Sequence, residues 1–128
     1  MIKVSIAMAV YNGASYLKRQ LDSILYQLEL NDEIVISYDQ STDATYSILE
    51  NYEKKDSRVK VFTNDGASGV FGNFQNAISK CRGDIIFISD QDDIWAENKI
   101  SRVKEILCDS QYSMVIHNGV HIDCNEKK

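Results

Sequence analysis

The sequence predicts an α/β fold built on a doubly wound, mostly parallel sheet. Apolar runs of strand length alternate along the chain with segments whose apolar residues recur at helical spacing. Strict alternation of the two element types is typical of a parallel sheet with helices on both faces. The length of 128 residues suits one domain with a core and is too short for two ordinary domains.

The first half of the chain predicts two strands and two helices. Apolar runs at residues 2–8 and 33–37 are expected to be strands, separated by a helix at 14–28. The inner face of that helix would hold Leu17, Leu21, Ile24 and Leu28. A second helix is expected after residues 41–43, which carry the Ser, Thr and Asp side chains that commonly cap helices. Its inner face would hold Ile48, Leu49 and Tyr52.

The second half predicts three more strands and two more helices. Residues 59–62, 84–89 and 112–117 are expected to be strands, and residues 120–122 would extend the last one or add a short strand. The nearly continuous apolar runs of the second and fourth strands predict burial on both faces. The intervening helices would bury Val70, Phe74, Ala77, Ile78 and Cys81, and then Ile100, Val103 and Leu107.

Composition excludes several classes of function. The net charge of −5 and the pI near 4.9 argue against nucleic acid as a partner, because phosphate backbones require a basic face. No apolar run is long enough to cross a bilayer, and the N-terminus lacks a signal-peptide pattern, which favours the cytoplasm. The three cysteines are odd in number and widely spaced, so a disulfide framework is not expected.

An acidic cluster follows the fourth predicted strand. The apolar run 85–88 stops at Asp90, Asp92 and Asp93, three acids within four residues. Carboxylates crowded at the end of a strand repel one another, and a divalent cation among them relieves that repulsion. Asp92 and Asp90 are therefore candidate ligands of Mg²⁺ or Mn²⁺, which would carry the diphosphate of a ligand. The alternative is a solvated acidic turn that caps the next helix.

Further polar residues are expected at the same edge, where open parallel sheets bind ligands. Tyr11 and Asn12 follow the first strand, and Asp39 follows the second. Tyr11 offers a face on which a base can stack, or it packs under its own helix. The Asp39 carboxylate can accept the N3–H of uracil or thymine, or it caps the second helix. Asp90 would bind ribose hydroxyls or complete the metal site.

Three other features favour structural interpretations. The glycines at 66, 69 and 72 do not have dinucleotide-binding spacing, so Gly69 and Gly72 are expected to allow a tight loop and close helix packing. The alternative is that backbone N–H groups of this stretch bind phosphate. A zinc site formed by His117, His121 and Cys124 matches no established spacing. Trp95 is expected to anchor its loop by packing.

Four motifs, in order, resemble family-2 glycosyltransferases with the A-type nucleotide-sugar fold, which is related to the Rossmann fold. They are Val4 to Gly13, Ser37-Tyr38-Asp39-Gln40-Ser41-Thr42-Asp43, Gly72-Asn73 with Asn76-Ala77, and Gly83-Asp84 leading into Ser89-Asp90-Gln91-Asp92-Asp93-Ile94-Trp95. The resemblance spans residues 2 to about 107. The last motif is especially similar to bacterial rhamnosyltransferases, which use a deoxythymidine diphosphate sugar.

The resemblance implies transfer of a sugar from a nucleoside diphosphate sugar to a hydroxyl, with inversion at the anomeric carbon. It implies a donor-binding set of Ala9, Tyr11, Asn12, Asp39, Asp90, Gln91 and Asp92, with Asp92 and Asp90 as metal ligands. The chain departs from the family pattern at three places. Ala9 stands where many members have proline, Tyr38 replaces an acid, and residues 70–73 lack a common arginine.

Length is the largest departure from the family. Members usually continue for a further acceptor-binding half, which supplies the catalytic base. We therefore expect residues 1–128 to be the donor-binding part, truncated after about the fifth strand, with the base beyond Lys128. The resemblance also implies a carbohydrate or lipid-linked acceptor, a role in cell-surface polysaccharide synthesis, and a location in the cytoplasm or at the inner membrane face.

Three rival functions are distinguishable from the sequence. A sugar-nucleotide nucleotidyltransferase needs a glycine- and lysine/arginine-rich loop after the first strand, and Tyr11-Asn12-Gly13 is not such a loop. A phosphoacceptor receiver domain needs acids after the first strand and a phosphorylated Asp after the third, and neither is present. A non-catalytic nucleotide-binding module stays open as an alternative.

Overall fold

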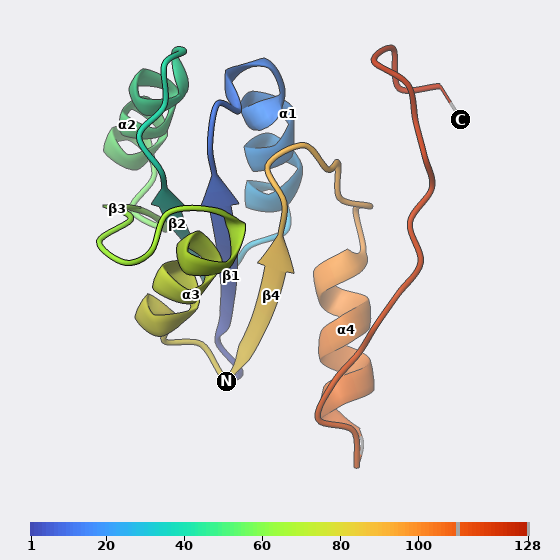
Figure 1. Ribbon diagram of the computed structural model, residues 1–128. Coiled ribbons are helices and arrows are strands. Elements are labelled where there is room, and N and C mark those ends of the chain that lie inside the picture. The colour runs from blue at the N-terminus through green and yellow to red at the C-terminus, as the bar shows by residue number, and fades with distance from the viewer. Residues whose placement is uncertain (110, 128) are drawn as a thin grey trace.

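The computed structural model describes residues 1–109 and 111–127. Within them the chain forms four strands that alternate with four helices: β1 (Val4–Val10), α1 (Ala14–Leu25), β2 (Glu33–Tyr38), α2 (Thr45–Lys55), β3 (Val59–Thr63), α3 (Val70–Lys80), β4 (Ile85–Ser89) and α4 (Lys99–Cys108). The strands form one parallel sheet in the order β3-β2-β1-β4 (Figure 1). The predicted α/β class is confirmed.

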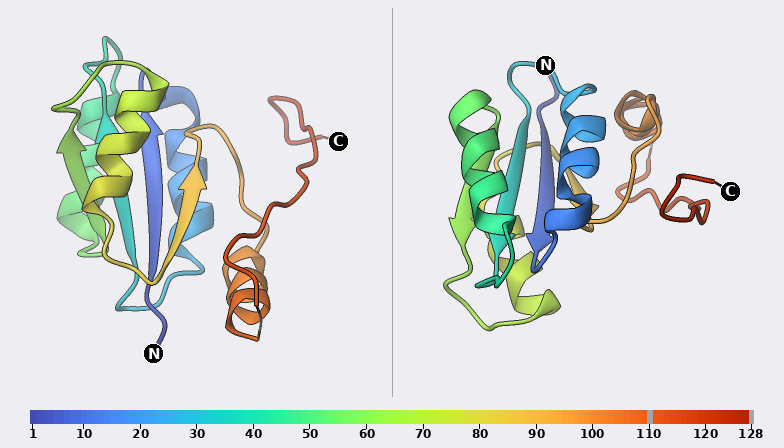
Figure 2. Two further views of the ribbon diagram at one scale, coloured as in Figure 1. Left: turned by 60° about the horizontal axis from the view of Figure 1, so that its bottom comes forward. Right: turned by 90° about the horizontal axis from the view of Figure 1, so that it is seen from above.

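The direction of each crossover decides which face a helix covers. The chain steps from β1 to β2 to β3 in one direction and then returns across the sheet to β4. Since crossovers between parallel strands are right-handed, α1 and α2 cover one face and α3 covers the other, as Figures 1 and 2 show. The strand order reverses between β1 and β4. Open α/β sheets bind ligands at such a switch point.

The main core lies between the sheet and α1. Alternate residues of β1 face this helix, and residues at helical spacing on α1 face the strand. The fully buried set comprises Val4, Ile6, Met8, Val10, Leu17, Leu21 and Ile24. The predicted inner face of this helix is confirmed, although α1 ends at Leu25 and the buried Leu28 lies in the following turn.

The predicted fifth strand is wrong. Residues 112–117 and 120–122 form no strand, and Met114 and Ile116 are 72% and 86% exposed. Part of this segment, Ser113 to His117, lines an apolar groove of about 450 Å³ together with β4 and α4. The segment has β-forming residues, but it makes no ladder with β4. Side-chain propensity without a hydrogen-bonded neighbour does not produce a strand.

The prediction that β4 is buried on both faces is also wrong. Phe87 and Ser89 are buried on the α1 side, whereas Ile86 and Ile88 are 43% and 62% exposed. The reason is that α3 packs chiefly on β1 and β2 and leaves this face of β4 uncovered. In the described part of the chain, the outer edge of β4 pairs with no other strand.

No helix within residues 1–109 and 111–127 combines the length and apolar character needed to span a membrane.

Candidate functional site

A cavity of about 330 Å³ opens at the carboxyl ends of β1, β2 and β4, against the N-terminal end of α3. It is lined by six of the seven residues predicted to bind a donor: Ala9, Tyr11, Asp39, Asp90, Gln91 and Asp92. The remaining lining residues are Gly69, Val70, Asn73 and Phe74. The structure therefore brings four separate segments together at the switch point of the sheet.

Asp39 holds the loop that precedes α3. One carboxylate oxygen accepts a hydrogen bond from Asn64 Nδ2 at 2.7 Å, and the other accepts one from the Gly69 backbone N–H at 2.9 Å. Gly69 has a φ of 97°, a conformation that favours glycine. Each carboxylate oxygen can accept more than one hydrogen bond, so both can still accept one from a ligand. Asp39 does not cap α2, which begins at Thr45.

Tyr11 and Asn12 have different environments. The Tyr11 side chain is 55% exposed and borders the cavity, so it is not packed under its own helix. The Asn12 side chain points instead to the connection between β2 and α2, where its Oδ1 accepts the Thr42 backbone N–H at 2.8 Å. Asn12 is the one predicted donor-binding residue that does not line the cavity.

The acids after β4 include a crowded pair, Asp90 and Asp92, while Asp93 interacts electrostatically with Lys99. Burial raises the pKa of Asp90, and the neighbouring charges of Asp93 and Asp92 raise it further. Within the described ranges, neither Asp90 nor Asp92 forms an ion pair with Lys or Arg, and no three His, Cys, Asp or Glu side chains lie close enough to share a metal. Two carboxylates with a ligand's phosphates and water are a donor set that Mg²⁺ accepts.

The Gln91 side chain is engaged by the backbone of a single residue. Its Oε1 accepts the Tyr11 N–H at 2.8 Å, and its Nε2 donates to the Tyr11 carbonyl oxygen at 2.9 Å. Both polar atoms of the amide are thus used within the protein, although the residue borders the cavity.

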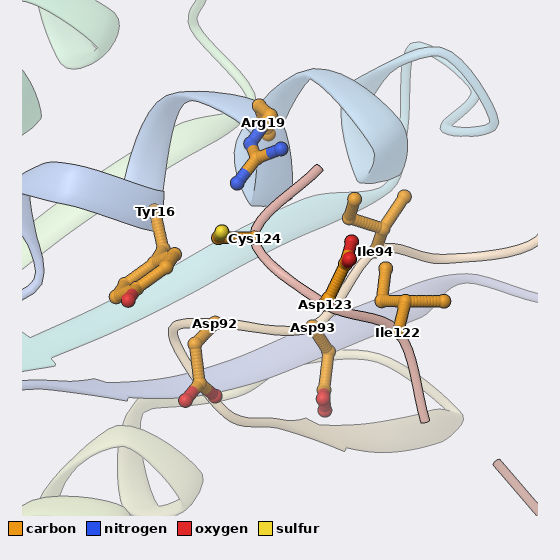
Figure 3. A pocket seen from close by; sticks show the side chains of 8 residues that line it. All are labelled: Tyr16, Arg19, Asp92, Asp93, Ile94, Ile122, Asp123 and Cys124. Carbon is orange, nitrogen blue, oxygen red and sulfur yellow. The ribbon is translucent and has the colours of Figure 1, made fainter. Parts of the chain in front are cut away.

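Asp92 also borders a second cavity, of about 220 Å³ (Figure 3). Tyr16 and Arg19 reach it from α1, whereas Ile122, Asp123 and Cys124 belong to the C-terminal segment. Arg19 forms an ion pair with Glu126 of that segment. Asp92 and Asp93 therefore lie between α1, the C-terminal segment and the larger cavity.

Two asparagines at the site were not predicted. Asn64 directly follows β3 and orients Asp39, so its position after a strand was a usable signal. Asn73 belongs to one of the family-like motifs, is 2% exposed and donates from Nδ2 to the Val10 carbonyl at 3.1 Å. This hydrogen bond joins α3 to the end of β1, the strand on which it packs. Sequence spacing does not reveal such a contact.

Structural interpretations hold for Trp95 and Gly72. Trp95 is 4% exposed, its ring centroid lies 5.4 Å from that of Phe87, and its backbone N–H donates to the Ser23 hydroxyl. Packing therefore anchors the connection after β4. A Cβ on Gly72 would lie 1.7 Å from the Ala67 carbonyl oxygen, so this glycine permits the close packing that the sequence predicts.

Comparison with known proteins agrees with this architecture. The model of the family "Glycosyl transferase family 2" matches residues 5–128. The Escherichia coli protein UDP-Glc:alpha-D-GlcNAc-diphosphoundecaprenol beta-1,3-glucosyltransferase WfgD is 34% identical, over 91% of this chain and 42% of its own. The putative teichuronic acid biosynthesis glycosyltransferase TuaG of Bacillus subtilis is 29% identical, over 94% of this chain and 50% of its own.

The same similarity extends to solved structures. The structure of S. aureus TarS 1-349 in complex with UDP-GlcNAc matches with a TM-score of 0.70 and 25% identity, over 84% of this chain and 31% of its own. The chain spans half or less of the length of the relatives described.

Proposed function

The chain belongs to glycosyl transferase family 2, and from this premise we propose that it is the donor-binding part of an inverting glycosyltransferase. The whole enzyme would transfer a sugar from a UDP- or dTDP-sugar to a hydroxyl of its acceptor. The acceptor-binding part and the catalytic base would lie outside residues 1–128. The relatives support this division, because the chain corresponds to 42% of one and 50% of another.

The observation that carries the proposal is that Asp39 and Asp92, from connections after different strands, line one cavity. We assign the pyrimidine to the Asp39 end, where the carboxylate would accept the N3–H and Tyr11 would stack on the ring. The diphosphate would lie at the Asp92 end. Cytosine has an acceptor at N3, so Asp39 would repel it.

The acidic end of the cavity fits a divalent cation. Asp90 and Asp92 would hold Mg²⁺ or Mn²⁺, with Asp92 as the main ligand. When bound, such a cation stabilises the charge of the departing diphosphate. Asp90 would also accept hydrogen bonds from ribose hydroxyls, while Tyr11 would shield the base from water. The fit follows from two neighbouring carboxylates that form no ion pair with Lys or Arg among the described residues, one of which has a raised pKa.

We place the parent enzyme in the synthesis of cell-surface polysaccharide. The name of the E. coli relative specifies a diphosphoundecaprenol-linked acceptor, and that of the B. subtilis relative specifies teichuronic acid biosynthesis. A carbohydrate or lipid-linked acceptor would bring the enzyme to the inner face of the membrane, with its active site in the cytoplasm.

Titration calorimetry with UDP and dTDP, in Mn²⁺ and in EDTA, tests the donor site. We expect Mn²⁺-dependent binding that Asp92→Asn weakens at least about tenfold, as loss of a direct charge-assisted contact predicts. The matched control is Glu97→Gln, which removes a charge from the same connection between β4 and α4 and should leave the affinity unchanged. Metal-independent binding that Asp92→Asn does not alter would contradict the metal assignment. CDP binding as tight as UDP binding would contradict the role of Asp39.

A further inference from the structure

We propose that Gln91 is a positioning residue that joins the turn after β1 to the acidic connection after β4, and so fixes the spacing between the base end and the diphosphate end of the cavity. The inference rests on the proposed function, which defines the base end and the diphosphate end of the cavity. Its geometry is independent of that function.

The hydrogen bonds of Gln91 bridge the switch point of the sheet. The ladder between β1 and β4 ends at the pair Met8–Ser89. Beyond this pair the β1–β4 ladder does not continue, and the two segments run on to Tyr11 and Gln91. There the Gln91 amide takes the place of a backbone partner, at 2.8 Å and 2.9 Å from the N and O atoms of Tyr11. Two parallel hydrogen bonds hold the turn in one orientation relative to the acids.

Gly13 lies against the same Gln91 amide. A Cβ at this position would lie 2.6 Å from Gln91 Oε1 and 2.9 Å from its Cδ. The Gly13 backbone has a φ of −103°, which any residue adopts, so no left-handed conformation requires glycine here. A side chain at position 13 would therefore require the Gln91 amide to move, and that movement would break its two hydrogen bonds to Tyr11.

The bridge has a direct consequence for binding. Tyr11 lies at one end of it, and Asp90 and Asp92 flank Gln91 at the other. A ligand that contacts both ends meets a site whose parts already hold their relative positions, so it loses less free energy to loop ordering. Without the bridge, the two ends would still bind their own parts of the ligand, but binding at one end would no longer favour binding at the other.

A double-mutant cycle on urea stability tests the geometry. We expect Gly13→Ala to lower the unfolding midpoint in the wild-type background, because the new methyl group displaces the Gln91 amide. The same substitution in a Gln91→Ala background should be neutral or slightly stabilising, since the opposing atoms are gone and alanine reduces the entropy of the unfolded chain. Equal effects of Gly13→Ala in both backgrounds would overturn the bridge. Gln75→Ala, at an exposed position on α3, is the control background and should leave the Gly13→Ala effect intact.

Nucleotide binding tests the positioning role. The measured quantity is the ratio of the UDP dissociation constants in EDTA and in Mn²⁺. We expect Gln91→Ala to lower this ratio about tenfold, within the usual range of coupling between sites, and Gln75→Ala to leave it unchanged. If Gln91→Ala only reduced the amount of folded protein, UDP binding would weaken equally in EDTA and in Mn²⁺ and the ratio would not change. An unchanged ratio would therefore overturn the positioning role. Absence of UDP binding in the wild type would instead refute the proposed function, while the stability cycle would still test the bridge.

Discussion

Glu33 and Asp90, two carboxylates at opposite ends of the sheet, have opposite environments. At the amino end of β2, the side chain of Glu33 is 2% exposed and surrounded by donors. It accepts hydrogen bonds from the Ser5 hydroxyl at 2.6 Å, the Arg82 backbone N–H at 2.8 Å and Lys60 Nζ at 2.6 Å, and Lys3 Nζ lies 3.3 Å away. At the carboxyl end of β4, Asp90 has acids as its charged neighbours.

The pKa values move in opposite directions for this reason. Burial raises the pKa of Glu33, but the hydrogen bonds from Lys60, Ser5 and Arg82 outweigh it and lower the pKa to about 2. Burial and the charges of Asp93 and Asp92 raise the pKa of Asp90. A carboxylate whose partners are supplied by the protein stabilises the fold. A cluster without such partners is a candidate for an external cation.

Removing the Glu33 carboxylate should have the largest effect on stability. Glu33→Gln keeps the shape but replaces two acceptor oxygens by one, and it leaves Lys3 and Lys60 without their anion. Because both lysines remain partly exposed, we expect a loss of about 2–3 kcal/mol, at the lower end of the cost of breaking a buried pair. Urea unfolding measures it, with the exposed Glu97→Gln as control. A loss below about 0.5 kcal/mol, as for an ordinary surface substitution, would contradict a structural role for Glu33.

Acid should remove the Glu33 contribution gradually. The pKa of Glu33 is lower in the folded protein than its ordinary value of 4.5, so the unfolded chain binds its proton first. The stability that Glu33 provides is therefore present above about pH 4.5 and lost as pH falls toward 2. Unfolding measured at several pH values should show the wild type and Glu33→Gln converging in this window. A constant gap between the two would contradict it.

The smallest effect is expected at the opposite end of the sheet. Asp90→Asn removes one of the crowded charges and no ion pair within the described residues, so the unliganded protein should gain up to about 0.5 kcal/mol. Thermal unfolding without metal measures this change. A loss of more than about 1 kcal/mol would mean that Asp90 supports the fold, and the contrast between the two ends would then fail.

The sequence predicts the parts of the fold that depend on local pattern. Apolar runs locate all four strands of the sheet, and helical spacing locates the inner face of α1. The proximity of Tyr11, Asp39 and Asp92 around one cavity was also predictable, because the carboxyl ends of parallel strands lie at one edge of the sheet.

The remaining features depend on contacts between distant segments. Residues 112–117 have strand propensity but no strand beside them, and propensity alone cannot report the missing neighbour. Asn12 and Gln91 have the polar side chains of a binding site, yet both bond to the protein itself. Glu33 begins a strand like an ordinary surface acid, but its carboxylate is buried among partners from other segments, Ser5, Lys60 and the Arg82 backbone. Spacing within one element reveals none of these partners.

The uncovered margin of β4 affects how the purified chain will behave in solution. In the part of the chain that the structure describes, the outer edge of β4 has no strand partner. Beside the exposed Ile86 and Ile88, this edge forms a template on which another copy can add edge to edge, the first step of many aggregates. The net charge of −5 opposes such encounters by mutual repulsion. Added electrolyte weakens that repulsion, so dilute samples in low-salt buffer will best preserve monodispersity.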